Sequence, residues 1–572
     1  MSADAKVLPL PRRGVKGFAL NNPTPPNMQM QKTRFARQSA AEKHWFGEPP
    51  TAELRTSASI AEDVGCRRNL VLSNFYKSSR GLTGGKCPLS NKINLTYKKG
   101  DETMKIAIIG AGSVVFCKTL ILDVLATPNM ENVEFCLMAP SERKSGQVRD
   151  YIEKVIKDNG LSAKVWTTTD RREAIKDAKY IILTFQVGGN TAFGIDYNIP
   201  MKYGVDQCIG DSMGPGGVFR AARSAPVLLE ICDEIKELSP DALVLNYVNP
   251  MAMVCWTLGT TGINYIGLCH GVQTTLDLIA GYVDVPKDEV DFLCAGINHM
   301  GWFLEMKHKG VDLYPKFKEV FEKPEYYVNE KVRGEVMRQF GYFCTESTGH
   351  LSEYLPWFRS SQRALDTYCD EPGFGGETGA YFKFCDAVAT KYSDKLLSPN
   401  EPTALPQRSI EYGSYIIEAM ELNRPFKLNG NITNNGLISN LPDDCCSEVP
   451  VYVDGTGIHP MYVGKLPTQL AALNLSNINV QRLGVEAAIT GDPELLVAAC
   501  ALDPLASTKC TLPEIREMVA EMLEAQKEWL PQFAGKKLRA TPEISIPKDI
   551  TPVSAPVDPA LAIFARFGEL GS

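Results

Sequence analysis

Two short segments in the middle of the chain carry side chains that could bind a metal ion. One is Cys269-His270-Gly271-Val272, and the other, further along, is Asn298-His299. A thiolate and an imidazole together suit a divalent transition metal. Two protein ligands leave coordination positions for water or substrate, as in a catalytic site. Cys269 and His299 are therefore candidate metal ligands, with the alternative that each is a core residue. His270 is a candidate substrate contact or acid, with structural packing as its alternative.

A glycine-containing turn lies far upstream of these residues. Gly110-Ala111-Gly112-Ser113 follows the apolar run Lys105-Ile106-Ala107-Ile108-Ile109 and precedes a helical pattern. Such a turn lets the backbone approach a pyrophosphate at a helix N-terminus. The third glycine of the usual fingerprint is replaced by Val115, and the acidic residue expected after the second strand is missing. The choice between NAD and NADP therefore stays open, and Arg143 could favour a 2′-phosphate. The candidate cofactor-binding residues are Gly110, Gly112, Ser113 and Val114.

Three further segments place polar side chains near the expected ends of strands or helices. Asn246-Tyr247-Val248-Asn249-Pro250 follows a predicted strand, where an amide can bind sugar hydroxyls or merely cap the next helix. Gly210-Asp211-Ser212 opens a glycine-rich loop that either closes over a ligand or is an ordinary surface loop. The segment 345–358 contains Glu353 and Tyr354, which can accept protons when a nearby cation tunes them.

The elements that position these segments alternate between strands and helices. Apolar strands are expected at 105–109, 133–138, 180–184, 243–247 and 264–268. Helices are expected at 114–126, at 142–158 and, after a loop at 186–217, up to about 238. This alternation predicts an α/β fold with a Rossmann-like, doubly wound parallel sheet. Ligands bind such sheets at the carboxyl ends of their strands.

The same patterns divide the chain into four parts. Residues 104–297 are predicted to form the NAD-binding domain, and 298–535 a mixed α+β catalytic and oligomerisation domain. Helices within the second domain are expected at 329–340, 407–421, 481–491 and 510–529. Residues 536–572 contain spaced prolines and are predicted to be an extended tail. Residues 1–103 are predicted to be a disordered extension ahead of Met104, with a basic targeting or interaction arm as the alternative.

Charge and composition exclude several classes of protein. Residues 1–103 carry 17 basic and 8 acidic side chains, a net of +9, so residues 104–572 carry −16. An acidic body argues against nucleic-acid binding by the folded part. Sixteen cysteines without regular pairing favour reduced thiols and a cytoplasmic location. No apolar run reaches the ~18 residues of a membrane span, and the N-terminus lacks the apolar core of a signal peptide.

These motifs, in this order, resemble the family 4 glycoside hydrolases over residues 104–535. The resemblance is strongest with the α-galactosidase and α-glucosidase branch. The matching segments are 110–113, 199–205, 209–212, 216–220, 246–253, 269–273, 295–300, 353–358, 434–438 and 477–481.

The resemblance implies a reaction that needs both a nucleotide and a metal. NAD⁺ oxidises the sugar at C3, a base removes the C2 proton, the aglycone leaves C1, water adds, and the hydride returns. A Mn²⁺ ion polarises the oxygens on C2 and C3. The resemblance also implies that Cys269 and His299 hold the metal and that Asn249 contacts substrate, with Asn190 as a second contact. The base is expected at Glu353-Tyr354, and Asp211 and His270 are further candidate catalytic residues.

The resemblance also bears on the substrate. The 6-phosphoglycosidases carry Asp where His270 stands, so a phosphorylated sugar is not expected. Galactosidase-like members often carry Ser where Gly271 stands, whereas Gly is typical of α-glucuronidases. An α-galactoside is therefore the first expectation, and an α-glucuronide the alternative. A 2-hydroxyacid dehydrogenase and a non-catalytic relative are more distant alternatives. The family relationship further implies a homodimer or homotetramer.

Overall fold

The structure is a computed structural model that describes residues 103–130, 132–392, 402–553 and 559–560. The chain divides into two units, Met1–Lys98 and Lys99–Ser572. All of the described residues belong to the second unit, so the prediction for the extension 1–103 lies outside them except at Thr103.

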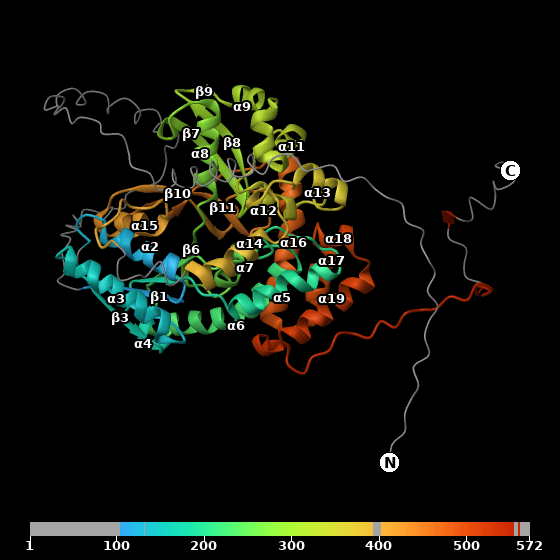
Figure 1. Ribbon diagram of the computed structural model, residues 1–572, viewed down its shortest axis with the longest axis horizontal. Coiled ribbons are helices and arrows are strands. Elements are labelled where there is room, and N and C mark those ends of the chain that lie inside the picture. The colour runs from blue at the N-terminus through green and yellow to red at the C-terminus, as the bar shows by residue number, and fades with distance from the viewer. Residues whose placement is uncertain (1–102, 131, 393–401, 554–558, 561–572) are drawn as a thin grey trace, which may run out of the picture. The chain divides into compact units, whose positions relative to one another are not determined.

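Six parallel strands form one half of the sheet in the order β3-β2-β1-β4-β5-β6. Figure 1 labels β1, β3 and β6 of this half. The order reverses between β1 and β4, which is the switch point where doubly wound sheets bind dinucleotides. The predicted α/β class with a Rossmann-like sheet is confirmed. The strands are β1 (Met104–Ile109), β2 (Val133–Met138), β3 (Lys164–Thr168), β4 (Tyr180–Leu183), β5 (Leu243–Asn246) and β6 (Asn264–Gly267).

Helices that connect these strands cover both faces of the sheet with apolar side chains. Ile106 and Ile108 of β1 pack into one core, and Ala107 and Ile109 into the other, because alternate side chains of a strand point to opposite faces. The helices are α2 (Val114–Leu125), α3 (Glu142–Asp158), α4 (Arg171–Ile175), α5 (Gly189–Lys202), α6 (Gly214–Leu238), α7 (Met251–Gly259) and α8 (Gly271–Val283).

Antiparallel strands continue the same sheet beyond β6, in the order β10-β11-β7-β8-β9, with β12 paired to β11. A single pairing, Asn431 with Gly267, joins the two halves. Strands β7 and β8 form a hairpin whose two-residue turn is Asn298-His299. The antiparallel strands are β7 (Val290–Ile297), β8 (Met300–His308), β9 (Val311–Asp312), β10 (Phe426–Thr433), β11 (Cys446–Asp454) and β12 (Gly457–Pro460).

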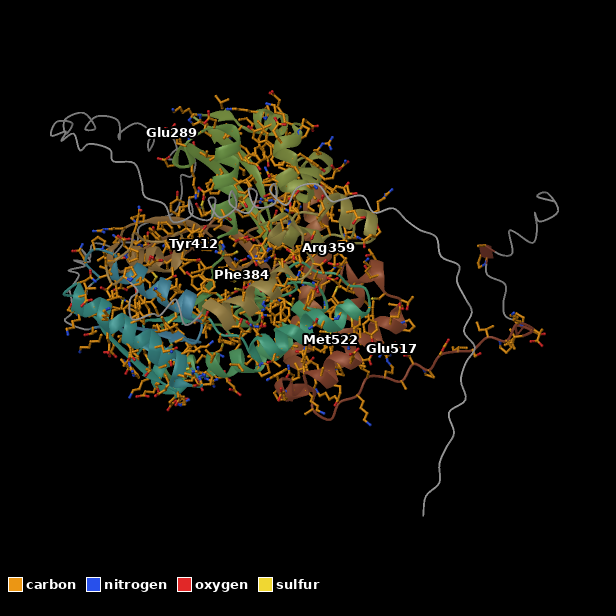
Figure 2. The ribbon with its side chains drawn as sticks, viewed as in Figure 1. Glu289, Arg359, Phe384, Tyr412, Glu517 and Met522 are labelled. Atoms are coloured by element: carbon orange, nitrogen blue, oxygen red, sulfur yellow. The ribbon has the colours of Figure 1, made fainter. Side chains whose placement is uncertain are left out.

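The remaining helices pack around the antiparallel half and against α5, α6 and α7. On α19, Met522 is buried and Glu517 is exposed, which confirms that the predicted helix near 510–529 is amphipathic (Figure 2). These helices are α9 (Tyr314–Phe321), α10 (Pro324–Tyr327), α11 (Lys331–Phe340), α12 (Thr348–Tyr354), α13 (Gln362–Tyr368), α14 (Ala380–Ala387), α15 (Tyr412–Leu422), α16 (Thr468–Thr490), α17 (Pro493–Leu502), α18 (Ala506–Lys509) and α19 (Leu512–Ala525).

Two parts of the parallel half differ from the expectation. The stretch expected to be a loop, 186–217, contains the helix α5, with Pro200 close to its end. The strand β3 and the helix α4 were not anticipated, and β3 is the edge strand of the sheet. Within the described residues, no helix combines the length and apolar character that crossing a membrane requires. The cysteines of these residues are all free thiols.

Candidate active site

Cys269 and His299 come from two parts of the sheet that are separated by β10 and β11. Cys269 follows the carboxyl end of the parallel strand β6 and directly precedes His270, the N-cap of α8. His299 lies at the tip of the β7–β8 hairpin with φ of +63°. A left-handed backbone at a non-glycine residue costs roughly 1–2 kcal/mol and is more frequent at functional sites. The two candidate ligands thus come from separate elements and meet at one edge of the sheet.

Glu346 joins this pair although the sequence did not single it out as a ligand. The segment before it pairs with β8, since Thr345 donates its N–H to the Gly301 carbonyl at 2.8 Å and Phe303 donates to Phe343 at 3.0 Å. Glu346 itself also has a left-handed backbone, with φ of +69°. This pairing carries the carboxylate to the hairpin tip, where His299 lies.

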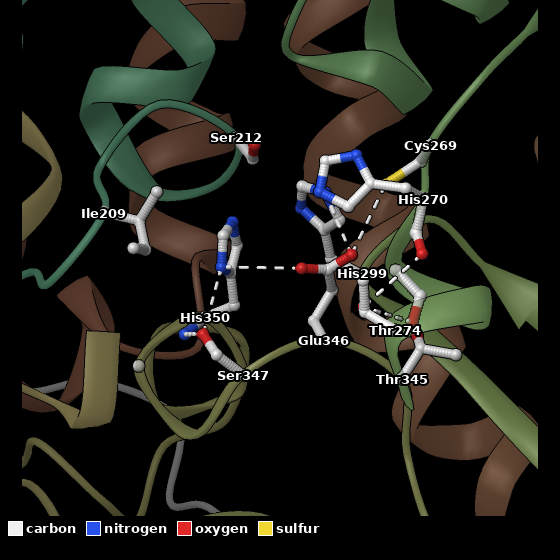
Figure 3. A network of polar contacts seen from close by, with 12 residues as sticks. Ile209, Ser212, Cys269, His270, Thr274, His299, Thr345, Glu346, Ser347 and His350 are labelled. Carbon is white, nitrogen blue, oxygen red and sulfur yellow. Dashed lines mark hydrogen bonds and ion pairs between the residues drawn. The ribbon is translucent and has the colours of Figure 1, made fainter. Parts of the chain in front are cut away.

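One ligand atom from each of Cys269, His299 and Glu346 lies within 4.8 Å of the others. Cys269 Sγ donates to Glu346 Oε1 at 3.3 Å, and His299 Nε2 is 3.8 Å from the same oxygen. Figure 3 shows His350 on the opposite side of the Glu346 carboxylate from Cys269 and His270. A soft thiolate, an imidazole and a carboxylate are a donor set that fits a divalent transition metal.

The ionisation of this cluster depends on its burial and on its close charges. Burial and the neighbouring Glu346 raise the pKa of the Cys269 thiol well above its usual range. Burial is the largest single influence on Glu346 and opposes its ionisation, but the His299, His350 and His270 rings and the Cys269 hydrogen bond together outweigh it and lower the pKa of Glu346 to about 2. A bound cation would favour the Cys269 thiolate, because metal binding and thiol deprotonation are coupled.

Gly271 is the residue against which the Glu346 carboxylate lies. A Cβ atom at position 271 would stand 1.7 Å from Glu346 Oε1. The first residue of α8 must therefore lack a side chain for the carboxylate to keep its place beside Cys269.

Tyr354 and His350 surround His299 on its other sides. Tyr354 Oη is 3.2 Å from His299 Nδ1, and the His299 and His350 rings meet edge to face with centroids 4.4 Å apart. The Nε2 atom of His299 is left to face Glu346. Burial raises the pKa of Tyr354 well above its usual range. The hydroxyl of Tyr354 therefore lies next to the candidate metal ligand.

Asp211, Asn249 and Arg220 form a second polar group beside the first. Asn249 Nδ2 donates to Asp211 Oδ2 at 3.0 Å, and Arg220 Nε donates to the Asn249 carbonyl at 3.1 Å. Burial alone would raise the pKa of Asp211, but the Arg220 guanidinium and the His350 ring lower it below its usual value. Arg220 Nη1 lies 3.6 Å from Asp211 and makes no hydrogen bond although it is buried. This nitrogen can donate to a ligand.

Three other predicted site residues make contacts of a different kind. Glu353 is buried and accepts hydrogen bonds from the backbone N–H groups of Ile209 and Gly210, so it fixes the loop that carries Asp211. His270 Nδ1 is 3.4 Å from Glu411, whose carboxylate raises the pKa of His270. Asn190, near the start of α5, donates to the Cys385 carbonyl at 3.2 Å.

The glycine turn occupies the switch point between β1 and β4. A Cβ at Gly110 would lie 2.6 Å from the Phe185 backbone nitrogen, and the φ of Gly110 is +102°. A Cβ at Gly112 would meet nothing within 4 Å. Ser113 is the N-cap of α2 but makes no side-chain cap hydrogen bond, and Val114 is the first residue of that helix, whose first turn has no acidic residue. The open helix N-terminus fits the pyrophosphate of a dinucleotide.

Comparison with known proteins gives matches over most of the described chain. A model of family 4 glycosyl hydrolases matches residues 105–285, and a model of the family 4 glycosyl hydrolase C-terminal domain matches residues 294–506. An α-galactosidase of Rhizobium meliloti is 41% identical over 76% of this chain and 90% of its own length. An α-galactosidase of Bacillus subtilis is 38% identical over 75% of this chain and 99% of its own length. An α-galacturonidase of Lachnoclostridium phytofermentans is 30% identical over 77% of this chain and 99% of its own length.

Solved structures share the fold. A 6-phospho-β-glucosidase of Thermotoga maritima, solved with manganese, NAD⁺ and glucose 6-phosphate, has a TM-score of 0.62 and 24% identity, and covers 74% of this chain and 99% of its own. A 6-phospho-α-glucosidase from gut microorganisms, solved with NAD and Mn²⁺, has a TM-score of 0.62 and 19% identity, with coverages of 75% and 99%.

Proposed function

Because this chain belongs to the family 4 glycosyl hydrolases, we propose that it is an NAD- and Mn²⁺-dependent α-glycosidase, specifically an α-galactosidase. One observation carries the proposal: the Cys269–His299–Glu346 cluster lies at the carboxyl edge of the same sheet whose switch point holds the glycine turn. The two α-galactosidase relatives, at 41% and 38% identity, support galactose as the sugar that the enzyme releases.

The residues present fit both groups that the reaction requires. The open space at Gly112 and the uncapped start of α2 suit a dinucleotide, and Cys269 with His299 supplies donors for a metal. When bound, NAD⁺ would take up and return the C3 hydride, and the metal would polarise the oxygens on C2 and C3. Every other part of the chemistry falls to side chains of this chain.

Tyr354 is the residue that we assign to remove the C2 proton, with Oη as the accepting atom. Of the two residues Glu353 and Tyr354, Tyr354 is the one that contacts His299. Burial raises the pKa of Tyr354 and so opposes the phenolate, but a proton on His299 Nδ1 would donate to Tyr354 Oη and favour it, and a cation held by His299 would add to this effect. The same hydrogen bond fixes the orientation of the ligand His299. We assign Glu353 a positioning role.

Asp211, Asn249 and Arg220 are assigned to bind the sugar. Asn249 presents an amide, Asp211 accepts hydrogen bonds from hydroxyls, and the free N–H of Arg220 donates to a sugar oxygen. Since Asp211 compensates the charge of Arg220, the set suits a neutral hexose better than a uronate. We also propose Asn190 as a further substrate contact, and His270, whose side chain is half exposed, as a candidate acid or substrate contact.

Gly271 does not favour a uronide in this chain. A Cβ at position 271 would collide with the Glu346 carboxylate, which explains why glycine stands there independently of the substrate. We therefore propose small α-galactosides as substrates in the cytoplasm. We also propose a homodimer or homotetramer, which is supported by exposed apolar side chains such as Leu502 and Leu512. Light scattering of the purified protein tests the assembly.

The decisive experiment compares nitrophenyl α-galactoside, α-glucoside and α-glucuronide as substrates, with NAD⁺, Mn²⁺ and a thiol present or omitted in turn. We expect the galactoside to be hydrolysed only when NAD⁺ and the metal are both present. In D₂O, the released galactose should carry deuterium at C2 because the proton removed by Tyr354 exchanges with solvent. Activity that survives both chelation and removal of the nucleotide would disprove the mechanism.

A further inference from the structure

Glu346 is a partly buried carboxylate, with 14% of its side chain exposed, and has no assigned role in the proposed reaction. It lies beside the two residues proposed to hold the metal, with Oε1 3.3 Å from Cys269 Sγ and 3.8 Å from His299 Nε2. All three ligand atoms lie within 4.8 Å of one another. Donors on one ion, each ~2.0–2.3 Å from it, are ~3–4.6 Å apart. A small inward movement of these side chains therefore closes the set around a single ion.

The backbone around Glu346 supports the same arrangement. The pairing of Thr345 with Gly301 joins this segment to β8, the strand that leaves His299. His299 and Glu346 both have left-handed backbones, and their side chains approach each other, with Nε2 and Oε1 3.8 Å apart. Such a conformation in a non-glycine residue persists where the surrounding structure imposes it.

Gly271 admits the carboxylate to this position. Its Cβ would stand 1.7 Å from Oε1 and 2.7 Å from Cδ of Glu346. The clash is with the end of a flexible side chain, so an alanine at 271 would displace the carboxylate and leave the helix in place. Gly271 and Glu346 therefore act as a matched pair on two elements that are far apart in the sequence.

We propose that Glu346 is the third protein ligand of the metal and that Gly271 is the residue that makes room for it. This inference rests on the proposed function, in which Cys269 and His299 alone hold the ion. A third, anionic ligand makes the ion resident in the enzyme before a sugar arrives, whereas a two-ligand site depends on sugar oxygens to complete its coordination. Three protein ligands still leave positions for the oxygens on C2 and C3.

The test measures Mn²⁺ binding to the full-length protein, stripped with a chelator and kept reduced, by isothermal titration calorimetry without sugar or NAD⁺. We expect Glu346→Gln to raise the Kd for Mn²⁺ by at least ~10–100-fold, the loss that even outer-sphere changes cause. Gly271→Ala should raise it similarly, and the double variant no further, since both changes remove the same contact. Gly281→Ala, also on α8 but with open space at its Cβ, is the matched control and should bind like the wild type.

Three results would overturn the inference. Wild-type affinity in Glu346→Gln excludes Glu346 as a ligand, even if the rate of hydrolysis falls. Additive losses in the double variant show that Gly271 acts by another route. No Mn²⁺ binding by the wild-type protein removes the proposed function along with the third ligand, which distinguishes the two failures. Circular dichroism of each variant shows whether it is folded. If Glu346→Gln is not folded, Gly271→Ala gives an independent test of the third ligand.

Discussion

At the scale of single residues, Gly112 separates cofactor binding from folding. Its Cβ position is open, so Gly112→Val places a side chain in free space beside the start of α2. We expect the Kd for NAD⁺ to rise at least ~10-fold, equivalent to ~1.4 kcal/mol, because the side chain occupies the space that a pyrophosphate needs. Titration of NAD⁺ followed by protein fluorescence measures this change, and the unfolding midpoint should not move.

Gly110→Ala is the comparison variant for that measurement. Its Cβ would collide with the Phe185 backbone, and its φ of +102° is disfavoured for alanine. We expect this variant to lose stability as well as NAD⁺ affinity. If Gly112→Val lost as much stability as Gly110→Ala, its weaker NAD⁺ binding would reflect unfolding and not the filled space at Gly112.

Glu448 gives a prediction about pH. Its carboxyl group is buried on β11 and has a weak partner in Asn431 Nδ2, at 3.4 Å. Burial, with a smaller contribution from Glu346, raises the pKa of Glu448 to about 8. Between its ordinary pKa and that value the folded protein retains a proton that the unfolded chain has released, so stability falls as pH rises, by at most ~1.4 kcal/mol per pH unit.

Glu448→Gln replaces the titrating carboxyl group with a neutral amide of similar shape, so the proton uptake at this position is lost. We expect the variant to gain stability relative to the wild type from pH 5 to pH 8 and the difference to level off above that. Urea unfolding of both metal-free proteins at a series of pH values measures it. Parallel stability curves across this range would mean that Glu448 titrates normally in the folded state.

At the scale of elements, Arg223 joins three helical segments through one buried network. Arg223 of α6 bonds Asp196 of α5 at 2.5 and 2.8 Å and Gln526, after α19, at 2.9 Å, with Arg223 and Asp196 fully buried. Arg223→Met leaves the Asp196 charge uncompensated, so we expect a loss of about 3–5 kcal/mol in unfolding free energy. Neutralising the partner as well, with Asp196→Asn, should recover part of that loss.

An exposed ion pair between α4 and α6 is the control for this prediction. Arg172 and Glu237, also at 2.5 Å, are both exposed to solvent. Arg172→Met should therefore leave the unfolding free energy nearly unchanged in the same urea experiment. If the two arginine variants lost equal stability, the burial of Arg223 would not be the cause.

Element boundaries show what sequence patterns can and cannot predict. The apolar strand β1 and its glycine turn were predicted because their signal is local. The helix α5 was expected to be a loop, since Gly188, Gly189 and Pro200 oppose a helix within it or at its ends. Tertiary packing against α6 and α19 overrides that preference. The short edge strand β3 was missed for the same reason: pairing with β2 defines it more than its own residues do.

The residues of the candidate site likewise divide into those that local sequence patterns predict and those that only the fold brings to the site. Cys269, His299, Asp211 and Asn249 belong to ordered motifs, and the sequence named them. Glu346 was missed because no local pattern indicates that segment 343–345 pairs with β8. The sequence did contain a signal, the glycine at 271 in place of serine, but its meaning depends on a contact across 75 residues that only the fold reveals.

At the scale of the whole molecule, the family match identifies the part of the chain that forms the enzyme. The first family model begins at residue 105. About three-quarters of this chain aligns with 90% of the length of one α-galactosidase and 99% of the length of another. Met104 is the first residue of β1, where the sheet begins. The two family models therefore match no part of residues 1–103.

We predict that a chain starting at Met104 keeps the unfolding midpoint, the Mn²⁺ affinity and the kcat/KM of the full-length protein. The reason is that the cofactor turn, the metal cluster and the sugar-binding group all come from residues after Met104. A chain starting at Ala111 is the contrasting variant, because it removes β1 from the centre of the parallel half, between β2 and β4. That variant should fail to fold, as judged by circular dichroism. A large fall in kcat/KM for the Met104 chain, at an unchanged midpoint, would place part of the catalytic machinery within 1–103.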